Sequence, residues 1–196
     1  MTKLSTVCVF CGSNPGTDPE FMEAATETGR FLAENGIRMV FGGGRVGLMG
    51  QVADTVMAEG GEVIGVIPRD LAEKEVAHQN LTELHVVNSM HERKALMAKL
   101  SDGFVAMPGG FGTFEEICEV ITWTQLGFQE KPCGILNVNG YYADLISLFD
   151  KATENGFIHS QHRRLVLVSD RIDDLIEKFR SFKPNHLEKW LDKDSI

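Results

Sequence analysis

Apolar positions fall into two kinds of segment that alternate along most of the chain. Short, almost continuous apolar runs predict buried β-strands, whereas longer segments with apolar residues three and four positions apart predict amphipathic helices. The predicted strands are residues 6–10, 38–44, 62–68, 84–87, 103–108, 132–138 and 165–168. The predicted helices are residues 19–35, 48–61, 90–100, 113–126, 142–155, 172–182 and 185–192, and residues 69–82 are polar and irregular.

This alternation predicts one α/β domain over residues 1–196. Strands that alternate with helices become parallel neighbours joined by crossover helices. We therefore expect a doubly wound, mostly parallel sheet of about seven strands with helices on both faces. Ligands of such sheets bind beyond the carboxyl ends of the strands, where the strand order reverses. Three strand ends rich in glycine or polar residues are candidate sites, at residues 11–16, 42–50 and 107–113.

Charge and composition narrow the range of partners. The chain has 196 residues, a net charge of −9 and a pI of about 5.1, which argues against nucleic acid and anionic membranes as partners. A small anionic ligand is still compatible with this net charge, because basic groups near a binding site can outweigh it locally. The N-terminus enters a strand almost at once and no apolar run approaches the length of a membrane span, so we expect a cytoplasmic protein.

The cysteines and histidines predict no metal site. Cys8 and Cys11 form a C-x-x-C pair, but they lie in an apolar strand, where positions three apart face opposite sides of the sheet. Buried small hydrophobic side chains are the favoured interpretation, and all four cysteines fit reduced thiols. The six histidines make no metal-ligand constellation, so we expect neither a metal nor an organic cofactor.

The stretch "MPGGFGTFEE", residues 107–116, follows a predicted strand and opens a predicted helix. Its three glycines would let the backbone approach a ligand, and the helix N-terminus would offer free N–H groups and a partial positive charge. These features predict an anion site, most naturally for a phosphate. Helix capping is an alternative, because Thr113 and Glu116 have the T-x-x-E spacing of a capping box. Capping accounts for these two residues but not for the glycines and proline before them.

The second glycine-rich strand end has the G-x-G-x-x-G spacing of a dinucleotide-binding loop, from Gly42 to Gly47. It follows the second predicted strand rather than the first. Leu48 and Met49 stand where a Walker loop has Lys and Ser or Thr. Binding of a monophosphate, or tight packing of strand against helix, therefore fits better than binding of a triphosphate. An NAD-dependent oxidoreductase stays open as an alternative function.

The stretch "NSMHERKALMAKL" predicts a helix with two cations in its first turn. Ser89 and Glu92 have capping-box spacing, so the helix starts near Met90. Arg93 then heads the apolar stripe and Lys94 lies beside it, where both oppose the helix dipole. Such a locally unfavourable choice often marks a functional site, but an arginine that snorkels at the edge of the core is an equal alternative. Because the substitution removes a charge that opposes the helix dipole, we expect Arg93→Ala to leave the stability of the protein unchanged.

The stretches "PGGFGTFEE", "MHERK" and "GGGRVGLMG" together resemble the LONELY GUY family of cytokinin riboside 5′-monophosphate phosphoribohydrolases, many of which were long labelled lysine decarboxylase-like. The family motif PGGxGTxxE matches Pro108 to Glu116, and GGGxxGLMG matches Gly42 to Gly50. The resemblance covers nearly the whole chain. It implies a Rossmann-like fold, usually in a homodimer, and hydrolysis of the N-glycosidic bond of a nucleoside 5′-monophosphate to free base and ribose 5-phosphate.

The resemblance also implies roles for individual residues. Arg93 and Glu116 match the catalytic pair. The matched substrate-binding positions are Glu75, Arg93, Lys94, Gly109, Gly110, Phe111, Gly112, Thr113, Glu115, Glu116 and Thr122. Ser13 and Gly43, at the other two strand ends, are expected to line the same pocket. Cleavage builds positive charge on the ribose, which a carboxylate can stabilise while the loop anchors the phosphate.

Two further functions fit these residues less well. A nucleotide-binding sensor without turnover would not need both Arg93 and Glu116, so their presence argues against it. A decarboxylase finds no lysine in a recognisable pyridoxal site. The preferred base, adenine or an N6-substituted adenine or another purine, does not follow from these residues, because all would share the phosphate and ribose contacts.

Overall fold

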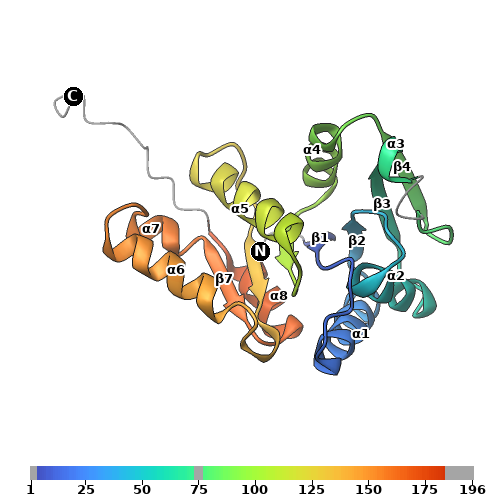
Figure 1. Cartoon of the computed structure of the whole chain (residues 1–196), viewed down its shortest axis with the longest axis horizontal. Helices are drawn as coiled ribbons and strands as arrows, with labels where there is room; N and C mark the ends of the chain where they lie inside the picture. Colours follow the sequence, from blue (N-terminus) through green and yellow to red (C-terminus); the bar gives the residue numbers. More distant parts are fainter. Residues whose placement is uncertain (1–3, 73–76, 184–196) are drawn as a thin grey trace.

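The computed structural model describes residues 4–72 and 77–183 and contains a seven-stranded parallel sheet with helices on both faces (Figure 1). The strands are Thr6–Phe10 (β1), Arg38–Phe41 (β2), Val63–Pro68 (β3), Glu83–Val87 (β4), Gly103–Ala106 (β5), Cys133–Leu136 (β6) and Val166–Ser169 (β7). Their order across the sheet is β4-β3-β2-β1-β5-β6-β7, and each neighbouring pair is parallel. The predicted α/β fold is confirmed.

Two groups of helices cover the two faces of the sheet. Helices α1 (Pro19–Glu34), α2 (Gly47–Ala58) and α8 (Ile172–Ser181) pack on one face. Helices α4 (Met90–Leu100), α5 (Phe111–Gln125) and α6 (Ala143–Glu154) pack on the other. Three single-turn elements complete the described structure, namely α3 (Arg69–Ala72), η1 (Val138–Gly140) and α7 (Ser160–Arg163).

Strand β1 shows how the sequence divides the core between these faces. Successive side chains of a strand point to opposite sides, so Val7 and Val9 enter the core below α1, α2 and α8, while Cys8 and Phe10 enter the core below α4, α5 and α6. Cys11 belongs to the first core, opposite Cys8, which confirms that the C-x-x-C pair faces two sides. Both thiols are free and buried.

Element boundaries differ from the sequence-based expectation in a consistent way. The strands predicted over residues 38–44 and 103–108 end at Phe41 and Ala106, whereas burial continues beyond both ends. The periodicity of single-turn helices is too short to detect, so α3 was expected to be irregular and α7 was not predicted. The predicted helix over residues 185–192 lies outside the described residues.

Strand β1 lies where the order of the sheet reverses. It pairs with β2 on one side and with β5 on the other, so the chain first builds outward to β4 and then restarts beside β1. The carboxyl ends of β1 and β5 therefore form the switch point at which open α/β sheets bind ligands. Among the described helices, none is long and apolar enough to cross a membrane.

Candidate active site

The three predicted strand ends meet at this switch point. The backbone N–H of Gly12 donates to Pro108 O at 3.0 Å, which joins the loop after β1 to the loop after β5. The N–H of Leu48, at the start of α2, donates in turn to Gly12 O at 3.0 Å. A cavity of about 190 Å³ opens between the first two loops and is lined by Gly12, Ser13, Gly109, Gly110 and Tyr141, among others. Backbone hydrogen bonds therefore join the three strand ends at one place on the carboxyl edge.

The glycines after β2 serve packing rather than dinucleotide binding. Gly47 has a φ of 62°, and a Cβ there would lie 2.3 Å from the carbonyl carbon of Ser13. The first N–H groups of α2, which a pyrophosphate would need, are already used, because those of Leu48 and Met49 both point at Gly12 O. This arrangement favours the packing interpretation of Gly42–Gly47 and disfavours the oxidoreductase alternative.

The N-terminus of α5 differs from the predicted capping box. The helix begins at Phe111 with Gly110 as its N-cap, so Thr113 lies inside the first turn and Glu116 lies further along. Thr113 is buried beside Gly109, where its side chain takes the place that a Cβ on Gly109 would need, and no described side chain caps the first turn. The capping interpretation of Thr113 and Glu116 is therefore wrong. The uncapped first turn keeps its N–H groups and its partial positive charge for an anion.

Two neighbouring glycines in this loop allow the needs of the fold to be tested apart from the needs of ligand binding. A Cβ on Gly109 would lie 2.2 Å from Thr113 Oγ1 and 2.9 Å from Gly12 N, whereas a Cβ on Gly110 meets nothing within 4 Å. We expect Gly109→Ala to lower both the melting temperature and activity. We expect Gly110→Ala to keep the melting temperature and lower activity, because its methyl group would enter the space in which we expect the anion. A fully active Gly110→Ala protein would contradict the anion site.

Arg93 lies in the first turn of α4 with its guanidinium fixed at the ends of two strands. Its Nε donates to Val66 O at 3.1 Å and its Nη2 donates to Gly42 O at 3.1 Å. The residue is only 8% exposed, so it does not reach solvent as the snorkelling alternative requires. Both acceptors are neutral carbonyl groups, which hold the guanidinium without neutralising its charge. The helix itself starts as predicted, because Ser89 Oγ accepts the N–H of Glu92.

Glu116 is a largely buried carboxyl group that faces this charge. Burial raises its pKa from the usual 4.5 to about 7, the positive charge of Arg93 opposes that rise, and the negative charge of Glu115 adds to it. A carboxyl group with a pKa near 7 can accept or donate a proton at neutral pH. The two predicted catalytic residues thus come from different helices, and the charge of Arg93 acts on the pKa of Glu116.

Lys94 is held in an ion pair rather than pointing into open solvent. Its Nζ lies 2.5 Å from Glu115 Oε1 and 3.0 Å from Glu119 Oε1, and its side chain is 13% exposed. Burial lowers the pKa of Lys94, but the bonds to Glu115 and Glu119 outweigh burial and leave the pKa raised. Lys94 therefore ties α4 to Glu115 and Glu119 of α5, on either side of Glu116 in the sequence.

The other predicted site residues are distributed unevenly. Ser13 is exposed in the cavity between the β1 and β5 loops, but Gly43 does not line that cavity, so the expected shared pocket is wrong for Gly43. Gly43 has a φ of 78°, and its carbonyl accepts the N–H of His78. Phe111 is 91% exposed beside the glycine loop. Thr122 lies six residues after Glu116, about 9 Å along the helix, and lines a separate cavity of about 120 Å³ between α5 and the α6–α7 region. Glu75 lies outside the described residues.

Two contributors to the glycine loop escaped the sequence analysis. Tyr141 and Tyr142 donate their hydroxyl groups to Gly109 O and Met107 O from more than thirty residues away. The only sequence signal was the Asn139–Gly140 turn after β6, which places the next residues at the carboxyl edge of the sheet. Nothing in the local pattern specifies their partners.

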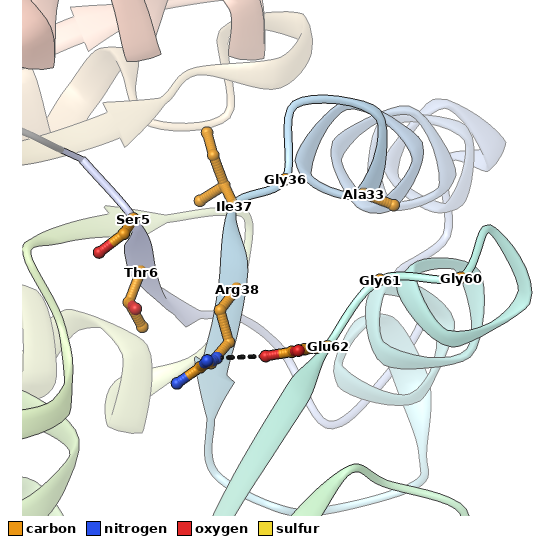
Figure 2. A pocket seen from close by; sticks show the side chains of 9 residues that line it. All are labelled: Ser5, Thr6, Ala33, Gly36, Ile37, Arg38, Gly60, Gly61 and Glu62. Atoms are coloured by element: carbon orange, nitrogen blue, oxygen red, sulfur yellow. Dashed lines mark hydrogen bonds and ion pairs between the residues drawn. The ribbon is translucent and has the colours of Figure 1, made fainter.

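A second cavity lies at the opposite edge of the sheet (Figure 2). It measures about 360 Å³ and opens near the amino ends of β1, β2 and β3. An ion pair with 2.6 Å between Arg38 Nε and Glu62 Oε2 crosses its wall, next to Ser5 and Thr6. None of the predicted site residues lines this cavity, so the carboxyl edge remains the candidate active site.

The chain is similar to known proteins in sequence and in fold. A family model described as "Possible lysine decarboxylase" matches residues 49–179. Two cytokinin riboside 5′-monophosphate phosphoribohydrolases of Arabidopsis thaliana are each 45% identical to the chain: one over 99% of this chain and 91% of its own length, the other over 94% and 86%. The molybdenum cofactor carrier protein from Chlamydomonas reinhardtii has a similar fold, with a TM-score of 0.68 at 20% identity, covering 91% of this chain and 98% of that chain.

Proposed function

The chain belongs to the family described as possible lysine decarboxylases, together with the cytokinin riboside 5′-monophosphate phosphoribohydrolases, and we propose that it hydrolyses a purine nucleoside 5′-monophosphate. The bond between the base nitrogen and C1′ of the ribose breaks, and its electron pair leaves with the base. Water adds to C1′. The products are the free base and ribose 5-phosphate, and the reaction calls for no metal or organic cofactor.

The observation that carries this proposal is the pairing of an anion site with a carboxyl group on one helix. The uncapped first turn of α5 and the glycine loop before it supply N–H groups for the 5′-phosphate. Glu116 follows on the same helix and has a pKa of about 7, so in its ionised form it can stabilise positive charge on the ribose and accept a proton from water. Arg93 supplies a fixed positive charge nearby, suited to hold the phosphate or the departing base.

Release of base should depend strongly on the 5′-phosphate. We expect AMP or an N6-substituted AMP to be cleaved far faster than the matching nucleoside at equal concentration, because the glycine loop has nothing to hold in a nucleoside. Free base is followed by chromatography. Equal rates with AMP and adenosine would rule out the phosphate anchor, and the same panel identifies the preferred base.

We further propose that the protein acts as a homodimer in the cytoplasm. The dimer is supported by family membership, and the location by free thiols at Cys8, Cys11, Cys118 and Cys133. Light scattering at micromolar concentration is expected to give twice the chain mass of 21.7 kDa. A single species at the chain mass would contradict the dimer without touching the proposed reaction.

A further inference from the structure

Three successive carbonyl groups of the glycine loop are each held by one donor. The buried hydroxyl of Tyr142 donates to Met107 O at 2.7 Å, the N–H of Gly12 donates to Pro108 O at 3.0 Å, and the hydroxyl of Tyr141 donates to Gly109 O. The loop between β5 and α5 is therefore fixed from outside, although its glycines would otherwise leave it mobile.

The two tyrosines reach this loop from the connection between β6 and α6. Asn137 Oδ1 accepts the N–H of Tyr142 at 2.7 Å, which fixes the turn that presents both rings. Tyr142 is 1% exposed and belongs to the core, whereas Tyr141 is 41% exposed and lines the cavity beside Gly109 and Gly110. The ring of Tyr141 packs edge-on against Phe21 and against Tyr142, with centroids 5.6 Å and 4.9 Å apart.

Because the peptide bond is planar, a hydrogen bond to a carbonyl group also orients the N–H of the next residue, where that residue has one. In a trans peptide the C=O of one residue and the N–H of the following residue point in opposite directions. The bond from Tyr141 to Gly109 O therefore also sets the direction of the N–H of Gly110. The bond from Tyr142 to Met107 O has no such effect, because the next residue is Pro108 and proline has no N–H.

We propose that Tyr141 is a positioning residue for phosphate binding, which orients the Gly109–Gly110 peptide so that the N–H of Gly110 donates to the 5′-phosphate of the substrate. The proposal rests on the proposed function. Tyr142 holds the end of β5 and stabilises the fold without directing a donor. The two hydroxyl groups thus make chemically identical bonds to the same loop, with different consequences.

The pair Tyr141→Phe and Tyr142→Phe tests this difference, because each variant loses one hydroxyl and keeps its ring. We expect Tyr141→Phe to raise KM for the nucleoside monophosphate about five- to tenfold, the effect of one hydrogen bond, with kcat and melting temperature nearly unchanged. Tyr142→Phe should instead lower the melting temperature, because it leaves a buried carbonyl without its donor, and should change KM less than twofold.

Binding of ribose 5-phosphate, measured by calorimetry, gives a readout that does not depend on turnover. Tyr141→Phe is expected to bind it about five- to tenfold more weakly than the parent protein. Unchanged binding, or equal weakening in Tyr142→Phe, would overturn the role of Tyr141. If the parent protein binds ribose 5-phosphate but releases base from no nucleoside monophosphate, the proposed reaction fails while the calorimetric comparison still decides the role of Tyr141.

Discussion

Glu116→Gln is expected to lower the rate of base release by about 10²- to 10⁴-fold, the range typical of a lost acid–base or charge-stabilising group. Glutamine keeps the size of the side chain but cannot carry negative charge opposite the ribose or accept a proton. The structure removes the capping explanation, because α5 begins at Phe111 and Glu116 lies beyond its first turn. Activity is measured as base release by chromatography under saturating substrate.

The matched control is Glu119→Gln, which removes a carboxylate three residues further along the same helix. Glu119 contacts Lys94, and Glu115 remains as a second partner of that lysine. We expect this variant to keep most of the parental rate. If Glu116→Gln releases base nearly as fast as the parent, the assignment of Glu116 to the reaction is wrong.

The raised pKa of Glu116 adds a pH signature to the same variant. If the ionised form is needed, kcat/KM of the parent should rise with pH through about 7. The stability of the folded protein should change with pH in the opposite direction. Between about pH 4.5 and 7, the Glu116 carboxyl group keeps its proton in the folded protein but releases it in the unfolded chain. The contribution of Glu116 to stability is therefore lost as the pH rises through this range. Glu116→Gln should abolish that loss and be more stable than the parent at pH 8, by up to about 3 kcal/mol, but not at pH 4. Thermal unfolding of both proteins at the two pH values measures this.

Gly42→Ala should inactivate the protein almost as fully as Arg93→Ala. A Cβ on Gly42 would lie 1.9 Å from Arg93 Nη2, so the guanidinium must leave its place. Misplacing a catalytic group by about 1 Å costs on the order of 10²-fold in rate. The φ of Gly42 is not in the left-handed region, so the backbone itself can accept alanine. Steady-state rates of base release with the preferred nucleoside monophosphate measure the loss.

A double-mutant cycle shows whether Gly42 acts through Arg93. Once Arg93 is alanine, the clash is gone, and adding Gly42→Ala should cost no further activity. The structure also changes the stability expected of Arg93→Ala. Relief from the helix dipole predicted no loss of stability, but the Arg93 side chain donates hydrogen bonds to two buried carbonyl groups. We now expect a loss of about 1–3 kcal/mol. Additive effects of the two substitutions on rate would show that Gly42 acts independently of Arg93.

The fold was predictable because its signal is local and repeated. Each buried strand appears as a short apolar run and each covering helix as a periodic one, so alternation alone gave the parallel sheet and the carboxyl edge as the place of the site. The boundaries of the helices and strands were harder to predict from the sequence. Met107 is as buried as the strand before it although β5 ends at Ala106, so hydrophobicity does not mark the end of the strand.

The contacts within the site were beyond reach because they join residues far apart in the chain. Arg93 bonds to carbonyls 27 and 51 residues away, and the tyrosine hydroxyls reach back 32 and 35 residues. Contacts between residues so far apart produce no periodic pattern in the sequence. The T-x-x-E spacing of Thr113 and Glu116 was misleading for a related reason, since a cap depends on the conformation of Gly110, which lies before the motif.

The central position of β1 has a consequence for the order in which the chain can fold. Residues 38–40 are available to pair with β1 soon after it is made, but its other neighbour, β5, begins only at Gly103. Until then one edge of an apolar strand stays unpaired, which is a surface that invites aggregation. Pairing across about a hundred residues is also slow, because a long loop must close before the contact forms. Nascent chains that end before β5 are therefore the species most in need of a chaperone.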